Sequence, residues 1–241
     1  HILKNNHTTN NKEIKKQQQY DKTFLVPYLH ELENKYGGTF PDEQKKKILN
    51  YYGLFITSFL FSNYTKLYGR TLTDAERKRA TLFGILTPVG DDLFDVDKLD
   101  TERIHLITYD PQNYTATTFS ANVAKEIQSF LLADVPHKEA YLLAAKNVLD
   151  IQIETARQTN PAIAEQELEY ITYMKGAASV IIYHQCLDDV AGEQMKEALF
   201  YTGSLTLMLC KDDKLQVIRN FTYNTPEDII YHLLNVCRSF D

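Results

Sequence analysis

The sequence predicts an all-α protein, and three observations support this prediction. Apolar residues recur at helical spacing through most of the 241 residues, and no segment shows a convincing alternation of apolar and polar residues. The 9 glycines and 7 prolines are few and fall between the long periodic segments. Hydrophobic residues make up 44% of the chain, which is enough for a globular protein with a real core. We find no repeat or linker, so we expect a polar N-terminal arm over residues 1–19 and a single-domain helical bundle over residues 20–241.

Two helices are expected in the first third of the chain. The first covers residues 20–36 and ends at the glycine pair that follows it. The second covers residues 42–68 and ends at Gly69. Its apolar residues nearly encircle the helix axis, which predicts that this helix is central in the fold. These apolar residues are Ile48, Tyr51, Tyr52, Leu54, Phe55, Phe59 and Leu60.

The third helix carries start and stop signals. Thr73 and Glu76 form a capping box at its start, and the periodic pattern continues to Asp95. Pro88 predicts a bend shortly before that end. Residues 96–116 look irregular. Further helices are expected over residues 117–134, 137–158, 162–191 with an interruption near Lys175, 193–221, and from Thr225 onward.

Composition excludes some classes of function. The formal net charge is −6, which argues against a nucleic-acid partner because such a partner requires a basic face. The longest apolar run is far too short to span a bilayer. The three cysteines are widely spaced in apolar helical segments, which is typical of buried thiols in a reducing compartment. No signal peptide is visible in the residues given, so we expect a cytoplasmic protein.

The first candidate site is the acidic end of the third helix. Asp91 and Asp95 lie one turn apart on the same face, and Asp92 lies about 100° around the axis. Like charges at this spacing repel by roughly 0.2–0.5 kcal/mol, and the negative end of the helix dipole adds a second penalty. A hard divalent cation such as Mg²⁺ removes both penalties. The alternative is an ordinary solvated acidic helix end.

The second candidate site lies in the expected helix over residues 193–221. Asp212, Gln216 and Asn220 are spaced four residues apart, so they line one helix face and each offers an oxygen to a hard cation. Basic side chains surround them and are suited to phosphate oxygens. These are Lys211, Lys214 and Arg219. The alternative is a solvated helix face of mixed charge.

A third element is Lys175 followed by Gly176 in the middle of a long helical segment. Glycine weakens a helix by about 1 kcal/mol relative to alanine. A lysine beside such a weak point is placed to contact an anion together with freed backbone groups. The alternative for Gly176 is close helix packing.

Together these elements resemble the class I isoprenoid (terpenoid) synthases. That family has an all-α bundle with a DDxxD motif on one helix and a second metal motif across the cavity. The resemblance covers about residues 45–240. It implies that two acidic walls bind Mg²⁺, with three ions held against a prenyl diphosphate. By this resemblance the metal ligands are Asp91, Asp92, Asp95, Asp212, Asp213, Gln216 and Asn220, and the diphosphate contacts are Lys175, Gly176 and Arg219.

The resemblance implies ionisation of the allylic diphosphate, with Asp91, Asp92 and Asp95 as the catalytic first motif. Two outcomes stay open: cyclisation, which would make the protein a lyase, and prenyl transfer, which would make it a transferase. Gln216 and Asn220 depart from the family pattern, so the alternative is a non-catalytic isoprenoid- or diphosphate-binding protein with a degraded metal site. A helical phosphohydrolase is less favoured because His105 and His184 have no adjacent aspartate. We also expect a homodimer.

Overall fold

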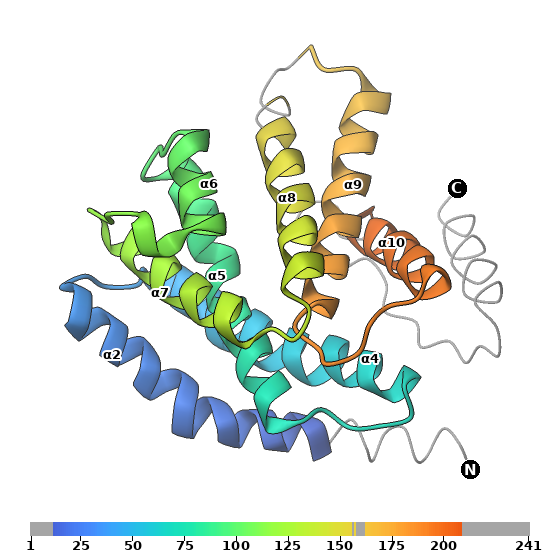
Figure 1. Ribbon diagram of the computed structural model, residues 1–241, viewed down its shortest axis with the longest axis horizontal. Helices are drawn as coiled ribbons and strands as arrows, with labels where there is room; N and C mark the ends of the chain where they lie inside the picture. Colours follow the sequence, from blue (N-terminus) through green and yellow to red (C-terminus); the bar gives the residue numbers. More distant parts are fainter. Residues whose placement is uncertain (1–11, 156, 158–161, 209–241) are drawn as a thin grey trace. The chain divides into compact units, whose positions relative to one another are not determined.

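The computed structural model describes residues 12–155, 157 and 162–208, and all regular secondary structure in these ranges is helical (Figure 1). The prediction of an all-α protein is therefore confirmed for the described part of the chain. Contacts divide the chain into two compact units. The first unit ends at Leu142 but also includes Gln185–Asp189, and the second holds the other described residues. None of the helices described is long and apolar enough to cross a membrane.

The N-terminal segment is already helical at residue 12, and this helix continues through η1 (Asp21–Leu25) into α2 (Val26–Tyr36). Residues 12–19 are therefore the helical end of the expected N-terminal arm, and their contacts with Arg77 were not predicted. Glu13 and Gln17 are buried because Arg77 donates hydrogen bonds of 2.8 and 2.7 Å to their side-chain oxygens. The predicted stop is confirmed, since Gly37 takes a left-handed conformation with φ of 62° at the end of α2.

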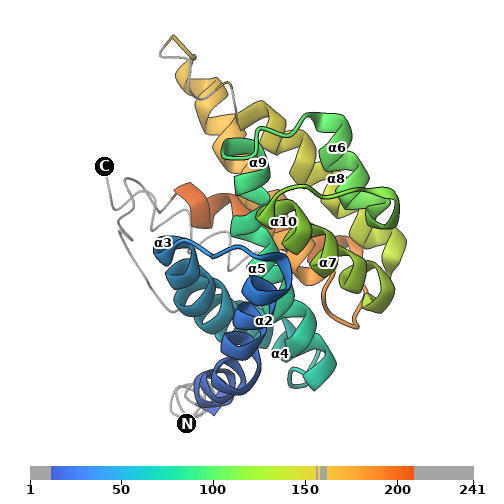
Figure 2. The same ribbon diagram turned by 90° about the vertical axis from the view of Figure 1, so that its left-hand side faces the viewer.

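The second helix consists of three consecutive segments, α3 (Asp42–Lys46), η2 (Lys47–Phe61) and α4 (Ser62–Leu67). Figure 2 shows α3 leading into η2, which lies beside α5. η2 and α5 are in contact. Its predicted central position is only partly confirmed, because Tyr51, Phe55 and Phe59 are 50%, 43% and 39% exposed. Their rings stack with centroids 5.9 and 5.4 Å apart. η2 is a π-helix, whose wide turns bring residues four apart nearly into line, so these three rings gather on one exposed face.

The third helix, α5 (Asp74–Asp95), matches its predicted bounds. The capping box is present: Glu76 N–H donates to Thr73 Oγ1 at 3.2 Å, and Thr73 N–H donates to Glu76 Oε2 at 2.9 Å. α5 packs against both η2 and α7 (Phe119–Asp134) and supplies many buried residues of the first unit. A Cβ added at Gly84 would lie 3.0 Å from Tyr52 Cβ, so α5 and η2 are in close contact.

The prediction that residues 96–116 are irregular is wrong. Much of this segment is helical, in α6 (Thr101–Tyr109) and in the short 3₁₀ helix η3 (Pro111–Asn113). Asp100 caps α6 by accepting a hydrogen bond of 2.9 Å from Arg103 N–H. Ile104 and Ile107, three residues apart, are buried and fix the inner face of this helix.

Gln185–Asp189 is held in the first unit by two arginines of that unit, Arg79, which is buried, and Arg70, which is partly exposed. Arg79 Nε donates to the Cys186 carbonyl at 2.7 Å, and Arg70 Nε donates to Asp189 Oδ2 at 3.0 Å. Cys186 is buried and carries a free thiol, as predicted. The other two cysteines, Cys210 and Cys237, lie outside the described residues.

The second unit holds most of α8 (Lys138–Thr155) together with α9 (Glu165–His184) and α10 (Glu193–Met208). α9 packs against α10 (Figure 1), and a small apolar core is formed by Ile151, Ile171 and Ala178. α9 runs through Lys175 and Gly176 without a break, so the predicted interruption there is wrong. The helix expected from Thr225 lies outside the described residues.

Candidate functional site

The acidic motif lies on the last turn of α5, in the first unit. Asp91 and Asp92 are half-buried, Asp95 is exposed, and the intervening Leu93 is buried. The N–H groups of Val96 and Asp97 both donate to the Asp92 carbonyl at 2.9 Å, which ends the helix. The motif therefore combines partly covered carboxylates with one that faces solvent.

Gln44 is the direct partner of this turn. Its Nε2 atom donates a hydrogen bond of 2.6 Å to Asp92 Oδ2 and approaches the Pro88 carbonyl at 3.4 Å. Because Gln44 lies in α3, this contact ties the start of the second helix to the end of α5. It holds the Asp92 carboxylate in one orientation and leaves its other oxygen for a further ligand.

The electrostatics of this turn disfavour several negative charges together. Burial raises the pKa of Asp92, and the nearby carboxylates of Asp97 and Asp95 raise it further, while the hydrogen bond from Gln44 and the charge of Lys47 oppose this rise. The pKa of Tyr52 is also raised, first by burial and then by the charge of Asp91. A cation at this turn would lower the free energy of the ionised carboxylates.

The acidic turn does not form a complete metal site by itself. Within the described ranges, no group of three His, Cys, Asp or Glu side chains is arranged to hold a metal ion. Mg²⁺ sites in proteins commonly use one or two carboxylates and take further oxygens from substrate phosphates, so Mg²⁺ binding by Asp91 and Asp92 stays a prediction.

The other predicted site residues fall into two groups. Lys175 and Gly176 lie on α9 in the second unit, where Lys175 is half-buried and Gly176 is buried. The residues of the second motif lie outside the described residues, namely Asp212, Asp213, Gln216, Arg219 and Asn220. The structure therefore brings together Asp91, Asp92 and Asp95 alone, and their pairing with the second motif stays a prediction.

Two residues beside the acidic turn were not predicted from the sequence. Gln44 follows the second helix start by two residues, and Tyr52 belongs to an apolar pattern that we assigned to the core. Neither carries a local signal that relates it to Asp91 or Asp92. Tyr52 is near the turn because η2 packs against α5, and Gln44 of α3 reaches Asp92 by a direct hydrogen bond.

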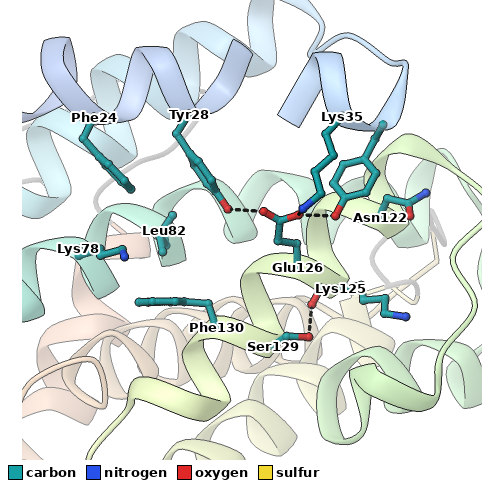
Figure 3. A pocket seen from close by; sticks show the side chains of 11 residues that line it. Phe24, Tyr28, Lys35, Lys78, Leu82, Asn122, Lys125, Glu126, Ser129 and Phe130 are labelled. Atoms are coloured by element: carbon teal, nitrogen blue, oxygen red, sulfur yellow. Dashed lines mark hydrogen bonds and ion pairs between the residues drawn. The ribbon is translucent and has the colours of Figure 1, made fainter. Parts of the chain in front are cut away.

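A separate groove of about 660 Å³ opens on the first unit between the N-terminal helix, α5 and α7 (Figure 3). At one end Glu126 accepts hydrogen bonds from the Tyr28 hydroxyl at 3.0 Å, the Lys35 ammonium at 2.6 Å and the Tyr36 hydroxyl. At the other end the Lys78 ammonium lies between the rings of Phe24 and Phe130. No local sequence signal marks this groove, because its residues come from three separate helices.

Comparison with known proteins matches the chain to a family model. Neither the curated proteins nor the solved structures include a match to the chain. The family described as "Protein of unknown function (DUF3822)" matches residues 116–241, which is more than half of the chain. The chain belongs to the DUF3822 family.

Proposed function

We propose that the protein is a Mg²⁺-dependent class I isoprenoid synthase that acts on a prenyl diphosphate by ionising its allylic C–O bond. The observation that carries this proposal is the acidic turn of α5, where Gln44 orients Asp92 while burial and the carboxylates of Asp95 and Asp97 raise its pKa. Such a turn favours a divalent cation, and the DDxxD pattern is the one expected for the first metal motif of that family. The all-α secondary structure is consistent with the same proposal.

In this proposal each group of residues has a defined role. Asp91, Asp92 and Asp95 would hold the metal, and Asp212, Asp213, Gln216 and Asn220 would supply further ligands. Lys175, Gly176 and Arg219 contact the diphosphate. Bound Mg²⁺ supplies positive charge that stabilises the departing diphosphate. The apolar faces of the helices keep water from the carbocation that remains, and the products follow by cyclisation, elimination or prenyl transfer.

A non-catalytic binding protein is the second candidate. The specific observation in its favour is that Gln216 and Asn220 depart from the family pattern, and that Asn220 in place of glutamate removes one negative charge from the second motif. Such a protein would bind an isoprenoid or a diphosphate without turning it over. In either form we place the protein in the cytoplasm as a homodimer, and these two assignments belong to the proposal.

The experiment is an assay of diphosphate release. The purified protein is incubated with geranyl, farnesyl or geranylgeranyl diphosphate, in the presence of Mg²⁺ or of EDTA, and ³¹P NMR follows free diphosphate. An enzyme releases diphosphate with at least one substrate only when Mg²⁺ is present, and Asp92→Asn abolishes the release. Tight binding without release would favour the binding protein. If the protein neither binds these diphosphates nor releases diphosphate from them, both candidates are contradicted.

A further inference from the structure

The groove on the first unit has a fixed polar end. Glu126 accepts from three donors, and although burial acts to raise the pKa of its carboxyl, the hydrogen bonds from Lys35, Tyr36 and Tyr28 outweigh burial and lower it. The carboxylate is therefore ionised at neutral pH, and its charge is matched by the Lys35 ammonium at 2.6 Å. These hydrogen bonds join α2 to α7 at this end of the groove and use most of the hydrogen-bonding capacity of the carboxylate.

The opposite end of the groove is apolar with a single cation. The Lys78 ammonium lies 4.5 Å from the centroid of the Phe130 ring and 6.0 Å from that of Phe24. Leu82, which is almost fully buried, also lines this end, and Tyr28 stacks on Phe24 with centroids 5.5 Å apart. Aromatic faces hold an ammonium group in place without neutralising its charge.

Lys78 has no anionic partner among the residues that the structure describes. Within the described ranges its ammonium contacts the two phenylalanine rings, and no carboxylate there lies within ion-pairing distance. Across the groove as a whole, three lysines line the wall and Glu126 is the one acidic residue. The lining thus has an excess of positive charge in a chain whose net charge is −6.

We propose that this groove binds a small aromatic anion, whose oxyanion pairs with Lys78 and whose ring packs against Phe24 and Phe130. The volume of about 660 Å³ lies within the usual range of roughly 300–1,000 Å³ for small-molecule sites. The rings offer flat surfaces for an aromatic body, and the half-buried ammonium gains a charge-assisted hydrogen bond when an oxyanion arrives. The ligand is recognised without a metal ion, which separates this site from the acidic turn of α5.

Calorimetric titration of the full chain with 1-naphthyl phosphate in the presence of EDTA tests this proposal. We expect saturable binding of one molecule per chain. Inorganic phosphate lacks the ring and 1-naphthol lacks the charge, so each should bind at least about ten-fold more weakly. A parallel titration with 1-naphthoate distinguishes a phosphate ligand from a carboxylate ligand, and saturable binding of either supports the proposal.

Variants of Lys78 identify the site. Lys78→Met keeps the apolar stem and should weaken binding roughly ten-fold or more, because a charge-assisted hydrogen bond is lost. Lys78→Arg keeps the charge and should bind within about three-fold of the natural protein. Lys22→Met removes an exposed lysine of η1 that does not line the groove, and Asp92→Asn alters the acidic turn, so both should leave the affinity unchanged.

Three results would overturn the proposal: absence of saturable binding in the natural protein, an unchanged affinity in Lys78→Met, or equal affinities for inorganic phosphate and 1-naphthyl phosphate. If circular dichroism shows that Lys78→Met fails to fold, Phe130→Leu provides the second test. Phe130→Leu keeps an apolar side chain but removes the ring. It should lower the affinity for 1-naphthyl phosphate several-fold more than the affinity for inorganic phosphate. Equal effects on the two ligands would overturn the aromatic assignment.

Discussion

Gln44 donates a hydrogen bond of 2.6 Å to the carboxylate of Asp92, although 48 positions separate the two residues in the chain. The contact joins α3 to the last turn of α5 and fixes one oxygen of a half-buried carboxylate. This arrangement positions an acidic group before any ligand binds, which is what a metal site requires of its protein ligands.

Replacement of Gln44 by alanine should raise the pKa of Asp92 further. Burial and the charges of Asp97 and Asp95 already raise this pKa, and the Gln44 amide is the hydrogen bond that opposes them. The measurement is a ¹³C NMR titration of the Asp92 carboxyl group in the natural protein and in Gln44→Ala. Gln19→Ala, at an exposed position of the N-terminal helix, serves as the control. An unchanged Asp92 titration in Gln44→Ala would show that the amide does not stabilise the carboxylate.

Asp21→Asn should stabilise the protein at alkaline pH. Burial raises the pKa of Asp21 to about 6 from an ordinary value of 3.8, and the hydrogen bond from Gln17 and the charge of Arg77 oppose this only in part. Because the folded state binds the proton more tightly, the stability linked to this proton is fully present below about pH 4 and is lost as the pH rises through 6. Asparagine avoids the buried charge, and its Oδ1 still accepts from Gln17.

Urea unfolding at pH 4 and at pH 8 measures this effect. We expect the free energy of unfolding of Asp21→Asn to exceed that of the natural protein by about 2 kcal/mol at pH 8, and by much less at pH 4. Glu43→Gln controls for the loss of one negative charge at an exposed position. A gain that is the same at both pH values would refute the link to ionisation of Asp21.

Arg70→Met should destabilise the first unit strongly. Arg70 Nη1 donates to Glu76 at 2.8 Å, and the Glu76 side chain has no exposed surface. Burial acts to raise the pKa of Glu76, but hydrogen bonds from Arg70, Asp188 N–H and Thr73 N–H lower it to about 2. Removal of the arginine leaves a buried carboxylate without its cation, which typically costs about 3–5 kcal/mol.

Thermal and urea unfolding at neutral pH compare the stability of Arg70→Met with that of the natural protein and of a control variant, Arg103→Met. Arg103→Met removes an arginine whose ion pair with Asp100 is exposed on both sides, and it should change stability by less than about 1 kcal/mol. Stability contributed by Glu76 is present above pH 4.5 and is lost as the pH falls towards 2, so Arg70→Met should also flatten the acid limb of the stability curve. Equal losses in the two arginine variants would contradict this account of Glu76.

Local sequence signals predicted the helices whose ends are set by their own residues. α5 is the clearest case, because the capping box of Thr73 and Glu76 lies in the same segment as the apolar pattern that ends at Asp95. Gly37 and Gly69 likewise mark helix ends through their positive φ angles. The placement of Asp91, Asp92 and Asp95 on one acidic turn followed from helix geometry alone.

Features that depend on distant partners were not predictable in this way. Residues 12–19 look like a solvated arm because Glu13 and Gln17 are polar, yet both are buried by Arg77, about 60 positions away. The contact of Gln44 with Asp92 and the groove around Lys78 have the same origin in tertiary packing. α6 was missed for a different reason: its cap at Asp100 was available in the sequence, but the helix spans only nine residues and its apolar pattern is short.

The most direct test of the central claim is a count of metal ions bound at the acidic turn of α5. Electron paramagnetic resonance measures Mn²⁺ bound by the full chain with and without farnesyl thiolodiphosphate, a substrate analogue that resists ionisation. We predict that the analogue increases the number of bound Mn²⁺ ions and that Asp92→Asn removes most of this increase, while the natural fold is retained. An analogue-dependent increase of the same size in Asp92→Asn, or no increase in the natural protein, would contradict the claim.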